Sequence, residues 1–372
     1  MSTPSAAAPV VSLSRAWLET WLTREWQRHS LWQILLRPLS WLFALLVALR
    51  RLSFHSGLRR STRIELPVII VGNITVGGSG KTPLVIALVE MLREHGYRPG
   101  VVSRGYGAHR GANRSDAPLE VDAAALDATA AFGDEPVLLA RRLHCPVFIG
   151  RDRVAAARAL CSQHPGVDVI LSDDGLQHYA LARDIEIAVL DGIHGVGNGA
   201  MLPAGPLREP VSRLNSVDAV AVYGSESGSG RHFGDSTLPT FAISLGAERF
   251  VNLRSGQQLG VAEFIAAAAG KPLHALAGIA HPQRFFSHLQ RLGLRTSDHP
   301  FADHHRFNAG DLALPATDLL LMTEKDAVKC AAFADERCWY LRVDAELPAA
   351  LFELILQRLH ELKLHPHSRK PS

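Results

Sequence analysis

Residues 66–83 read Leu-Pro-Val-Ile-Ile-Val-Gly-Asn-Ile-Thr-Val-Gly-Gly-Ser-Gly-Lys-Thr-Pro and carry the strongest local signal in the chain. Residues 66–72 form an apolar run that ends in glycine, which is typical of a strand buried in a parallel sheet. Residues 83–94 continue with apolar side chains at helical spacing, and Pro83 stands where a missing N–H costs little. A strand, a glycine-rich loop and a helix in this order predict a phosphate-binding loop.

The chemistry of this loop predicts how it holds a nucleotide. Glycines let backbone N–H groups turn inward around phosphate oxygens, and the helix N-terminus adds a partial positive charge. Lys81 can reach the β- and γ-phosphates, and the hydroxyl of Thr82 can ligate Mg²⁺. We therefore expect the nucleotide at Asn73, Thr75, Gly77, Gly78, Ser79, Gly80, Lys81 and Thr82. Thr75 stands where the pattern has its first glycine, and a glycine-rich turn without nucleotide is the alternative.

A second acidic element completes this type of site. The apolar run 167–173 ends in Asp173, and Asp174 follows it directly. An aspartate that emerges from a buried strand can hold Mg²⁺ directly or through water. Two aspartates exceed what one metal contact requires, so the second can orient a nucleophile or complete the metal shell. Which of the two ligates Mg²⁺ stays open, and solvated loop acids are the alternative.

The surrounding pattern predicts an α/β protein. Strand-like runs recur at 101–103, 146–150, 167–173, 185–191 and 217–223, with helical patterns at 135–143 and 152–163 between them. Strands that alternate with helices predict a mostly parallel sheet flanked by helices. We take residues 64–223 as this domain.

A glycine- and serine-rich break at 224–236 is the candidate domain boundary. Further strand-like runs follow at 239–245, 274–279, 318–323 and 339–343, around helices near 261–269 and 282–292. They predict a smaller C-terminal α/β domain over 237–363, and we expect residues 364–372 to be a disordered tail.

The N-terminal segment 1–63 differs from the rest in charge. Its nine arginines and two acidic residues give it a charge of +7, whereas the whole chain sums to +3. Five of the six tryptophans also lie in it. Tryptophan prefers the headgroup level of a bilayer, and arginine is attracted to anionic lipid. These features predict a segment that associates with a membrane surface.

The apolar run 39–49 is shorter than the ~20 residues of a membrane span, and Arg37 and Pro38 interrupt it on the N-terminal side. Before it, Trp17, Trp21 and Trp26 recur at helical spacing. We expect amphipathic helices that lie in the interface. The alternatives are a helix pair packed on the protein's own core and a true span. A cleaved signal peptide is disfavoured because the run starts late and no small-residue cleavage site follows.

Composition excludes several other classes. Hydrophobic residues make up 47% of the chain and charged residues 20%, which excludes a mainly disordered or collagen-like protein. The four cysteines form no C-x-x-C pair, so a zinc ribbon, a thioredoxin-type motif and a disulfide framework are excluded as well.

Weaker polar clusters lie elsewhere, and each has a simpler interpretation. The stretch 133–136, Gly-Asp-Glu-Pro, stands at a predicted helix start, where Asp134 can simply cap the helix. Residues 303–305, Asp-His-His, can bind a metal, transfer a proton or lie solvated on the surface. Residues 202–210 form a proline-rich loop with one arginine, and Thr-Glu-Lys-Asp at 323–326 ends a strand.

In combination, these elements resemble the tetraacyldisaccharide 4′-kinase family of the P-loop NTPase superfamily. The matching pieces are, in order, GN-x₃-GGSGKTP at 72–83, SRGYG at 103–107, GDEP at 133–136, SDDGLQH at 172–178, LPAGPLRE at 202–209, FADHH at 301–305 and TEKDAVK at 323–329. Several of these motifs are not shared with other P-loop proteins. Leu176 departs from the pattern, which has an aromatic residue there, and this change is expected to alter packing or acyl contact.

The resemblance implies a kinase of lipid A biosynthesis. It would transfer the γ-phosphate of ATP, with Mg²⁺, to the 4′-hydroxyl of tetraacyldisaccharide 1-phosphate and form lipid IVA. The implied location is the cytoplasmic face of the bacterial inner membrane, with peripheral or monotopic attachment. The expected partners are the acylated glucosamine disaccharide 1-phosphate lipid and the membrane surface, with no nucleic acid and no obligate protein partner.

Residue patterns and resemblance together give the candidate site. Catalysis is assigned to Asp134, His304, Lys81 and Asp174, and the metal to Thr82, Asp173, Asp174 and Glu135. The substrate is assigned to Arg104, Tyr106, Arg153, Gln177, His178, Arg208 and His305. The resemblance makes Asp134 and His304 the joint base for the 4′-hydroxyl, although His305 stays open as the catalytic histidine.

Two other classes of protein compete with this interpretation. A membrane-associated switch or partition-type P-loop ATPase has a similar loop, but it usually carries a second lysine where this chain has Ile74, Val76 and Ser79. A GTPase would carry N-K-x-D, and Thr-Glu-Lys-Asp lacks the spacer. A purely structural adaptor would not need the loop and the acid pair together.

Overall fold

The computed structural model describes residues 22, 25–28, 30–77, 80–105, 117–125, 128–224 and 238–365. The strands are β1 (Val68–Gly72), β2 (Pro99–Ser103), β3 (Leu119–Glu120), β4 (Val147–Ile149), β5 (Val169–Asp173), β6 (Ile185–Asp191), β7 (Ala219–Tyr223), β8 (Thr240–Asn252), β9 (Gln258–Gly260), β10 (Leu273–Ala277), β11 (Ser297–Pro300), β12 (Leu319–Thr323) and β13 (Cys338–Glu346). The helices are α2 (Leu31–His55), α3 (Lys81–Glu94), α4 (Ala128–Phe132), α5 (Asp134–Leu143), α6 (Arg153–Gln163), α7 (Val261–Ala267), α8 (Pro282–Arg291), α9 (Glu324–Cys330) and α10 (Ala349–Leu364), with 3₁₀ turns at Val211–Ser216 and Ala309–Leu312.

The strands form one continuous path in the order β11-β10-β12-β13-β8-β7-β6-β1-β5-β2-β4-β3, and β9 pairs with β8 beside it. In the first half of the sheet, which includes β7, β6, β1, β5, β2 and β4, all neighbouring strands are parallel. In the second half, β11, β10, β12 and β13 are parallel too. The predicted fold class, a mostly parallel sheet flanked by helices, is confirmed.

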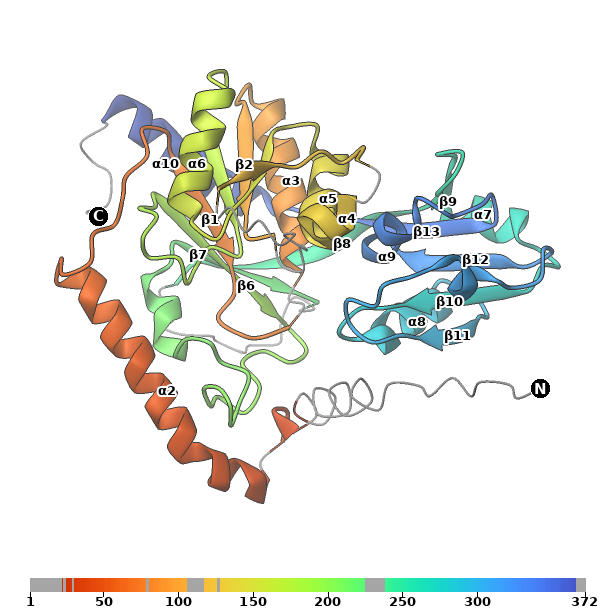
Figure 1. Ribbon diagram of the computed structural model, residues 1–372, viewed down its shortest axis with the longest axis horizontal. Coiled ribbons are helices and arrows are strands. Elements are labelled where there is room, and N and C mark those ends of the chain that lie inside the picture. The colour runs from red at the N-terminus through yellow and green to blue at the C-terminus, as the bar shows by residue number, and fades with distance from the viewer. Residues whose placement is uncertain are drawn as a thin grey trace, which may run out of the picture.

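The long strand β8 joins the two halves (Figure 1). Its first residues, Thr240–Ile243, pair in parallel with β7, and its later residues, Ser244–Asn252, pair antiparallel with β13. One strand therefore belongs to both halves of the sheet, and the predicted break at 224–236 lies just before it. Residues 225–237 are outside the described part of the chain.

Both faces of the first half are covered, which explains why its strands are apolar on both sides. Ile69 and Val71 of β1 point into a core shared with α3 and α5, while Val68 and Ile70 point into the opposite core with α6. Parallel strands leave their carboxyl ends at one edge, so the loops after β1, β2, β4, β5 and β6 open on the same crevice.

The last helix returns to the first half of the chain. Leu351, Ile355 and Leu359 of α10 are fully buried in the same core as Leu84 and Leu88 of α3. The division into domains 64–223 and 237–363 stays a prediction, but this packing places α10 with the first unit because its apolar face is buried there. Leu364 ends α10, and residues 366–372 of the predicted tail are outside the described residues.

The helix α2 runs without interruption from Leu31 to His55 and passes through Arg37 and Pro38. Arg37 and Pro38 therefore interrupt the apolar run in the sequence but do not interrupt the helix. A proline removes one N–H donor but leaves the flanking turns able to form, and Ser40, two residues later, fastens the helix to the body. The Ser40 hydroxyl donates to the carbonyl of Met201 at 2.9 Å and accepts from the N–H of Ala204 at 2.9 Å.

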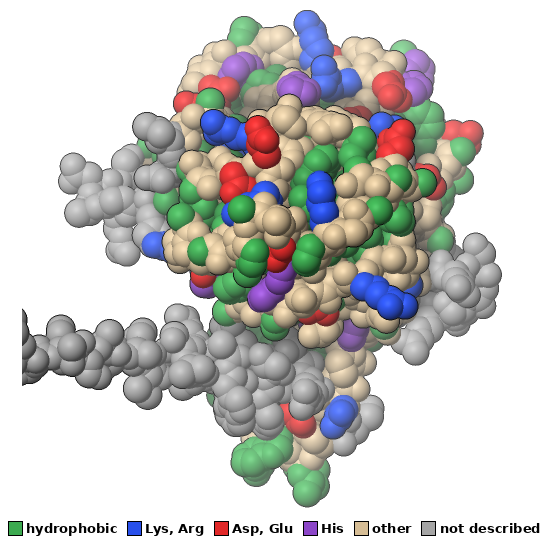
Figure 2. Space-filling view, turned by 90° about the vertical axis from the view of Figure 1, so that its right-hand side faces the viewer, with side chains coloured by type: hydrophobic (Ala, Val, Ile, Leu, Met, Phe, Trp, Pro, Cys, Tyr) green, Lys and Arg blue, Asp and Glu red, His purple; other side chains and the backbone are tan. Residues whose placement is uncertain are grey.

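Most of α2 lies outside the body, and its lower end projects below it in both views (Figure 1, Figure 2). The helix is long and apolar enough to cross a membrane by length and composition, with only 11% of its most apolar stretch buried. Packing on the protein's own core does not account for α2.

Of the residues before α2, Trp26 is buried, and its indole N–H donates to the carbonyl of Pro203 at 2.9 Å. The predicted helical spacing from Trp17 to Trp21 lies outside the described residues.

Candidate functional site

The glycine-rich loop turns where the sequence predicts it. The helix α3 begins at Lys81, and Gly80 precedes it with φ +81°, a left-handed conformation that favours glycine. A Cβ atom at Gly80 would lie 2.7 Å from the ring of Tyr223, so no larger residue fits without displacement. Gly77 also has a positive φ of +108°. Gly78 and Ser79 are outside the described residues.

The proline-rich loop 202–209 pairs with the first half of this phosphate-binding loop. The N–H of Val76 donates to the carbonyl of Pro206 at 2.8 Å, and the N–H of Arg208 donates to the carbonyl of Ile74 at 2.7 Å. Thr75, which replaces the first glycine of the pattern, forms a β-bridge with Leu207. This pairing places the side chain of Arg208 beside the nucleotide loop, a position that the sequence alone does not give.

Lys81 and Arg208 meet at one carboxylate. The Nζ atom of Lys81 lies 3.3 Å from Oδ1 of Asp174, and a guanidinium nitrogen of Arg208 lies 3.1 Å from Oδ2. Burial alone would raise the pKa of Asp174, but the two positive charges outweigh it and lower the pKa to about 2. Asp174 also has a left-handed backbone, with φ +49°. It is therefore a permanent anion that orients both cations at the end of β5.

The neighbouring Asp173 has the opposite character. It is fully buried, and the hydroxyl of Ser103 donates to its Oδ2 at 3.3 Å. Its Oδ1 is buried and accepts no hydrogen bond from the described residues. Burial, together with the negative charges of Glu135 and Asp174, raises the pKa of Asp173 to about 7. A buried oxygen that lacks a donor and sits among acids is suited to a cation.

This donor set fits Mg²⁺. Asp173 supplies an unsatisfied oxygen and Thr82 a hydroxyl at the start of α3. Among the described residues, no three histidine, cysteine or acidic side chains form a group that could hold a metal ion. Mg²⁺ usually takes one or two carboxylates and completes its shell with water and phosphate oxygens, so two protein donors are sufficient. Glu135, also predicted as a ligand, forms an ion pair with Lys325 at 3.1 Å, and its negative charge helps to raise the pKa of Asp173. Its role as a metal ligand stays a prediction.

Asp134 begins α5, and the residue that caps this helix is Gly133. The Oδ2 atom of Asp134 lies 3.2 Å from Nδ1 of His304, which comes from the other half of the chain. Lys329 lies 3.8 Å from the same oxygen. Burial raises the pKa of Asp134, but the hydrogen bond to His304 and the charge of Lys329 outweigh it and lower the pKa. The simple capping interpretation does not describe this contact.

The two predicted histidines have different surroundings. His304 has a left-handed backbone, with φ +57°, and its half-exposed ring faces Asp134. His305 places Nε2 at 3.1 Å from Oδ2 of Asp311 and stacks on Phe301, with 4.6 Å between ring centroids. The structure thus brings His304 to Asp134 and holds His305 within its own loop.

The structure describes four of the remaining predicted substrate residues, Gln177, His178, Arg104 and Arg153. The side-chain amide of Gln177 donates to the carbonyl of Asn73 at 2.9 Å. Burial, together with the positive charges of Arg153 and Arg104, lowers the pKa of His178 to about 4. Arg104 is exposed at the end of β2, and Tyr106 lies outside the described residues. Arg153 is fully buried and donates to the carbonyl of Gly150 at 2.6 Å. Such burial does not fit the predicted contact of Arg153 with a lipid headgroup.

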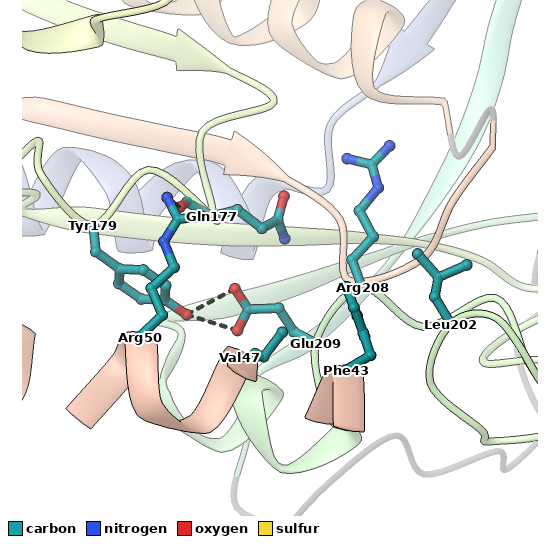
Figure 3. Close-up of a pocket in the computed structure, with 8 residues that line it drawn as sticks. All are labelled: Phe43, Val47, Arg50, Gln177, Tyr179, Leu202, Arg208 and Glu209. Atoms are coloured by element: carbon teal, nitrogen blue, oxygen red, sulfur yellow. Dashed lines mark hydrogen bonds between the residues drawn. The ribbon is translucent and has the colours of Figure 1, made fainter. Parts of the chain in front are cut away.

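A cavity of about 290 Å³ lies between α2 and the body (Figure 3). Its lining combines an apolar helix face with polar groups from the crevice loops: Phe43, Val47, Arg50, Gln177, Tyr179, Leu202, Arg208 and Glu209. Arg208 therefore belongs both to this cavity and to the cluster around Asp174. The sequence analysis assigns no site role to Tyr179, Glu209 or Arg50, because only the fold brings these segments together.

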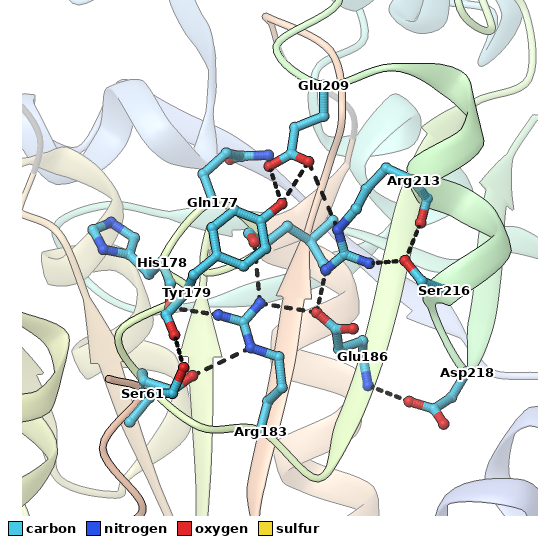
Figure 4. Close-up of polar contacts among 12 residues, drawn as sticks. Ser61, Gln177, His178, Tyr179, Arg183, Glu186, Glu209, Arg213, Ser216 and Asp218 are labelled. Carbon is cyan, nitrogen blue, oxygen red and sulfur yellow. Dashed lines mark hydrogen bonds and ion pairs between the residues drawn. The ribbon is translucent and has the colours of Figure 1, made fainter. Parts of the chain in front are cut away.

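A buried polar network supports one wall of the cavity (Figure 4). The hydroxyl of Tyr179 lies 2.7 Å and 2.6 Å from the two carboxylate oxygens of Glu209. Arg213 and Arg183 both pair with Glu186, and both lie over the ring of Tyr179. Leu176 is fully buried in the core and lies close to Gly72, and the effect of the departure at this position stays a prediction.

Comparison with known proteins is consistent with this geometry. The chain matches the family described as Tetraacyldisaccharide-1-P 4'-kinase over residues 32–360. A tetraacyldisaccharide 4'-kinase of Methylobacillus flagellatus is 47% identical over 347 residues, which are 92% of this chain and 96% of that protein. A protein of the same name from Aromatoleum aromaticum is 49% identical over 334 residues, covering 90% of this chain and 96% of the relative.

A crystal structure described as the "apo" form of LpxK from Aquifex aeolicus in complex with ATP is similar in fold. Its TM-score is 0.74 at 26% sequence identity, and the match covers 88% of this chain and 100% of that chain. The predicted resemblance is confirmed, and a switch-type ATPase is not favoured. Because the family match spans residues 32–360 and the relatives cover nine-tenths of the sequence, the chain belongs to the tetraacyldisaccharide-1-phosphate 4'-kinase family.

Proposed function

We propose that this protein transfers the γ-phosphate of ATP to the 4′-hydroxyl of a tetraacylated glucosamine disaccharide 1-phosphate, with Asp134 and His304 as the base. The observation that carries the proposal is the 3.2 Å contact between these two residues across the halves of the chain. Asp134 opens α5, and His304 stands on the loop after β11, so neither half alone forms the pair.

The nucleotide is proposed to bind in the loop between β1 and α3. Backbone N–H groups at the start of α3 and the ammonium of Lys81 would hold the phosphates. Lys81 is paired with Asp174 at 3.3 Å, and a phosphate within its reach would compete for it. Mg²⁺, held by Asp173 and Thr82, would neutralise charge on the phosphate oxygens. Arg208 would face the transferring group in this proposal, since it shares Asp174 with Lys81.

The acceptor hydroxyl needs a base because its pKa is far above 7. In our proposal, Asp134 accepts the Nδ1–H of His304, which makes Nε2 the basic nitrogen. The hydroxyl oxygen bonds to the γ-phosphorus as its proton moves to Nε2. The bond from phosphorus to the β–γ bridging oxygen breaks, and ADP leaves with that electron pair. The carboxylate stabilises the imidazolium that forms, as in other carboxylate–histidine pairs.

The helix α2 is proposed to hold the enzyme in the membrane that carries its substrate. Its outward face is apolar and exposed, with Leu31, Trp32, Ile34, Leu35, Leu39, Trp41, Leu42, Leu45, Leu46, Leu49 and Leu52. Its inner face lines the cavity next to Arg208. Acyl chains along α2 would leave the sugar and its phosphate beside the crevice. We place the protein at the cytoplasmic face of the inner membrane, since ATP must reach the site.

The test of this function is the coupling of ATP turnover to the acylated acceptor. The purified full chain should form ADP and phosphorylated disaccharide in equal amounts, and it should form little ADP without the lipid. The Lys81→Ala variant, assayed in parallel, measures contaminating ATPase activity. Steady ATP hydrolysis that ignores the acceptor would instead identify a switch or partition-type ATPase.

A further inference from the structure

We propose that Lys329 is a positioning residue for the phosphoryl transfer. Together with Asp326, it holds the histidine turn, residues 303–305, so that His304 stays in contact with Asp134. This inference rests on the proposed function of the Asp134–His304 pair. It assigns a role to the motif at 323–329, which the proposed chemistry does not otherwise use.

The two charged residues form a buried pair on one face of α9. Lys329 and Asp326 are three residues apart, and Nζ lies 2.7 Å from Oδ1. Their side chains are only 5% and 0% exposed. A pair this deeply buried is costly to desolvate, so its presence is weak evidence for a contribution to net stability. The other contacts of the pair indicate its role.

Asp326 fixes α9 to the end of β10. Its Oδ2 accepts from the N–H of Gly278 at 2.9 Å and from the hydroxyl of Thr323 at 2.7 Å. Gly278 follows β10 directly, and a Cβ atom there would lie 3.2 Å from Asp326 and 3.3 Å from the Cβ of His305. The backbone of β10, the helix α9 and the histidine turn are thus in close contact at one point.

Lys329 extends this attachment to the histidine turn. Its ammonium lies 3.3 Å from the carbonyl oxygen of His305 and 3.4 Å from that of Gly278, and it donates to both. The same nitrogen is 3.8 Å from Oδ2 of Asp134, on the other half of the chain. One side chain therefore contacts the backbone next to His304 and the carboxylate that His304 must meet.

The turn requires such support because its backbone is strained. His304 has φ +57°, a left-handed conformation that is unfavourable for a residue with a Cβ. The ring is half-exposed, and outside the pair with Asp134 its contacts include Asp303 at 3.9 Å. Without the ammonium, the carbonyl of His305 loses a hydrogen-bond donor, and the turn holds His304 less firmly in this conformation. Figure 1 shows α9 on the side of the second half that faces α5.

The test is a double-mutant cycle between Lys329→Met and His304→Ala in the full chain. A positioning role predicts that Lys329→Met lowers kcat by about tenfold or more, since a displaced base forfeits part of the ~10²–10⁴ that such a group contributes. The KM values for ATP and for the acylated disaccharide should change little. In the His304→Ala background, the same substitution should cost almost nothing further, because residues that act as a unit are not additive.

Other outcomes separate the possible failures. If Lys329→Met lowers kcat by the same factor with and without His304, Lys329 has only a structural role and the inference is overturned. An inactive His304→Ala with a fully active Lys329→Met also overturns it, yet leaves the proposed function intact. A fully active His304→Ala refutes the proposed function, and the inference with it.

Two further variants exclude a folding artefact. If Lys329→Met does not fold, the neutral double variant Asp326→Asn/Lys329→Met removes the uncompensated buried charge, and the cycle is repeated on it with the same expectations. Arg63→Met breaks another ion pair to a buried aspartate, since Arg63, which is 30% exposed, lies 2.9 Å from Asp184 just before β6. This control should change stability without changing the coupling to His304.

Discussion

Replacing Tyr179 with phenylalanine removes one hydroxyl from the network under the cavity. The ring, which lies 5.3 Å and 5.8 Å from the guanidinium carbons of Arg183 and Arg213, keeps its packing. The carboxylate of Glu209, however, loses the donor that both of its oxygens share at 2.6–2.7 Å. Arg213 stays beside the carboxylate at 3.7 Å, which is too long for a hydrogen bond.

The magnitude follows from the burial of Glu209, which is 1% exposed. A buried acceptor that loses its partner costs about 1–3 kcal/mol. Because the entropy of unfolding is about 2.1 cal/mol/K per residue, this loss lowers the Tm of a chain of 372 residues by about 1–4 °C. The hydroxyl hydrogen bond also fixes the wall of the cavity beside Arg208, so the KM for the acylated acceptor should rise while the KM for ATP stays unchanged.

The assay is thermal unfolding of the two proteins together with acceptor kinetics. Tyr97→Phe is the matched control, because Tyr97 packs against Lys363, 3.9 Å from its ring centroid, and its hydroxyl forms no hydrogen bond within the part of the chain that the structure describes. We expect its Tm to stay within about 1 °C of the parent. A Tyr179→Phe protein as stable as the parent, or an equal loss in Tyr97→Phe, would refute the reasoning.

Three further predictions concern the nucleotide, the metal and the membrane. Lys81→Ala should lower kcat by about 10²–10³ with the fold intact, measured by product formation and circular dichroism, since it removes one well-placed charge on the transferring group. Burial raises the pKa of Asp173 to about 7, so this carboxyl loses its proton as the pH increases through 7. Mg²⁺-dependent ATP affinity should therefore rise over that pH range, and Asp173→Asn should abolish the rise. Deleting residues 1–60 should release the protein from vesicles that contain anionic lipid, in a flotation assay, and unchanged binding would reject α2 as the attachment.

Much of the first half of the fold could be predicted from the sequence. Buried parallel strands are continuous apolar runs, so β1, β5, β6 and β7 are visible as such, and glycine next to Lys81 marks the start of α3. The edge strands β9 and β11 are short and exposed, and they lack such a signal.

The helix α10 was missed for another reason. Its apolar residues recur at helical spacing, yet its position after the last predicted strand suggested a terminal segment of the second domain. Only tertiary packing against α3 shows that it completes the first core. Likewise, the interruption of the apolar run at Arg37 and Pro38 hides the full length of α2, which Ser40 fastens to residues 201 and 204.

The site was predictable where one motif carries the chemistry. Lys81 and Asp173 follow directly from local patterns, whereas the contact of Asp134 with His304 joins residues 170 positions apart and came from the family resemblance. Arg153 illustrates the limit of such reasoning. Position at a crevice loop suggested a ligand contact, but the side chain turns inward and donates to carbonyls of Gly150 and Asp173.

The most direct test of the central claim is the kcat of Asp134→Asn, His304→Ala and their double variant, with the acylated disaccharide as acceptor. If the two residues form one base, each single variant loses about 10² or more, and the double loses little beyond the worse single. Full activity in Asp134→Asn, or losses that multiply in the double variant, would contradict the account.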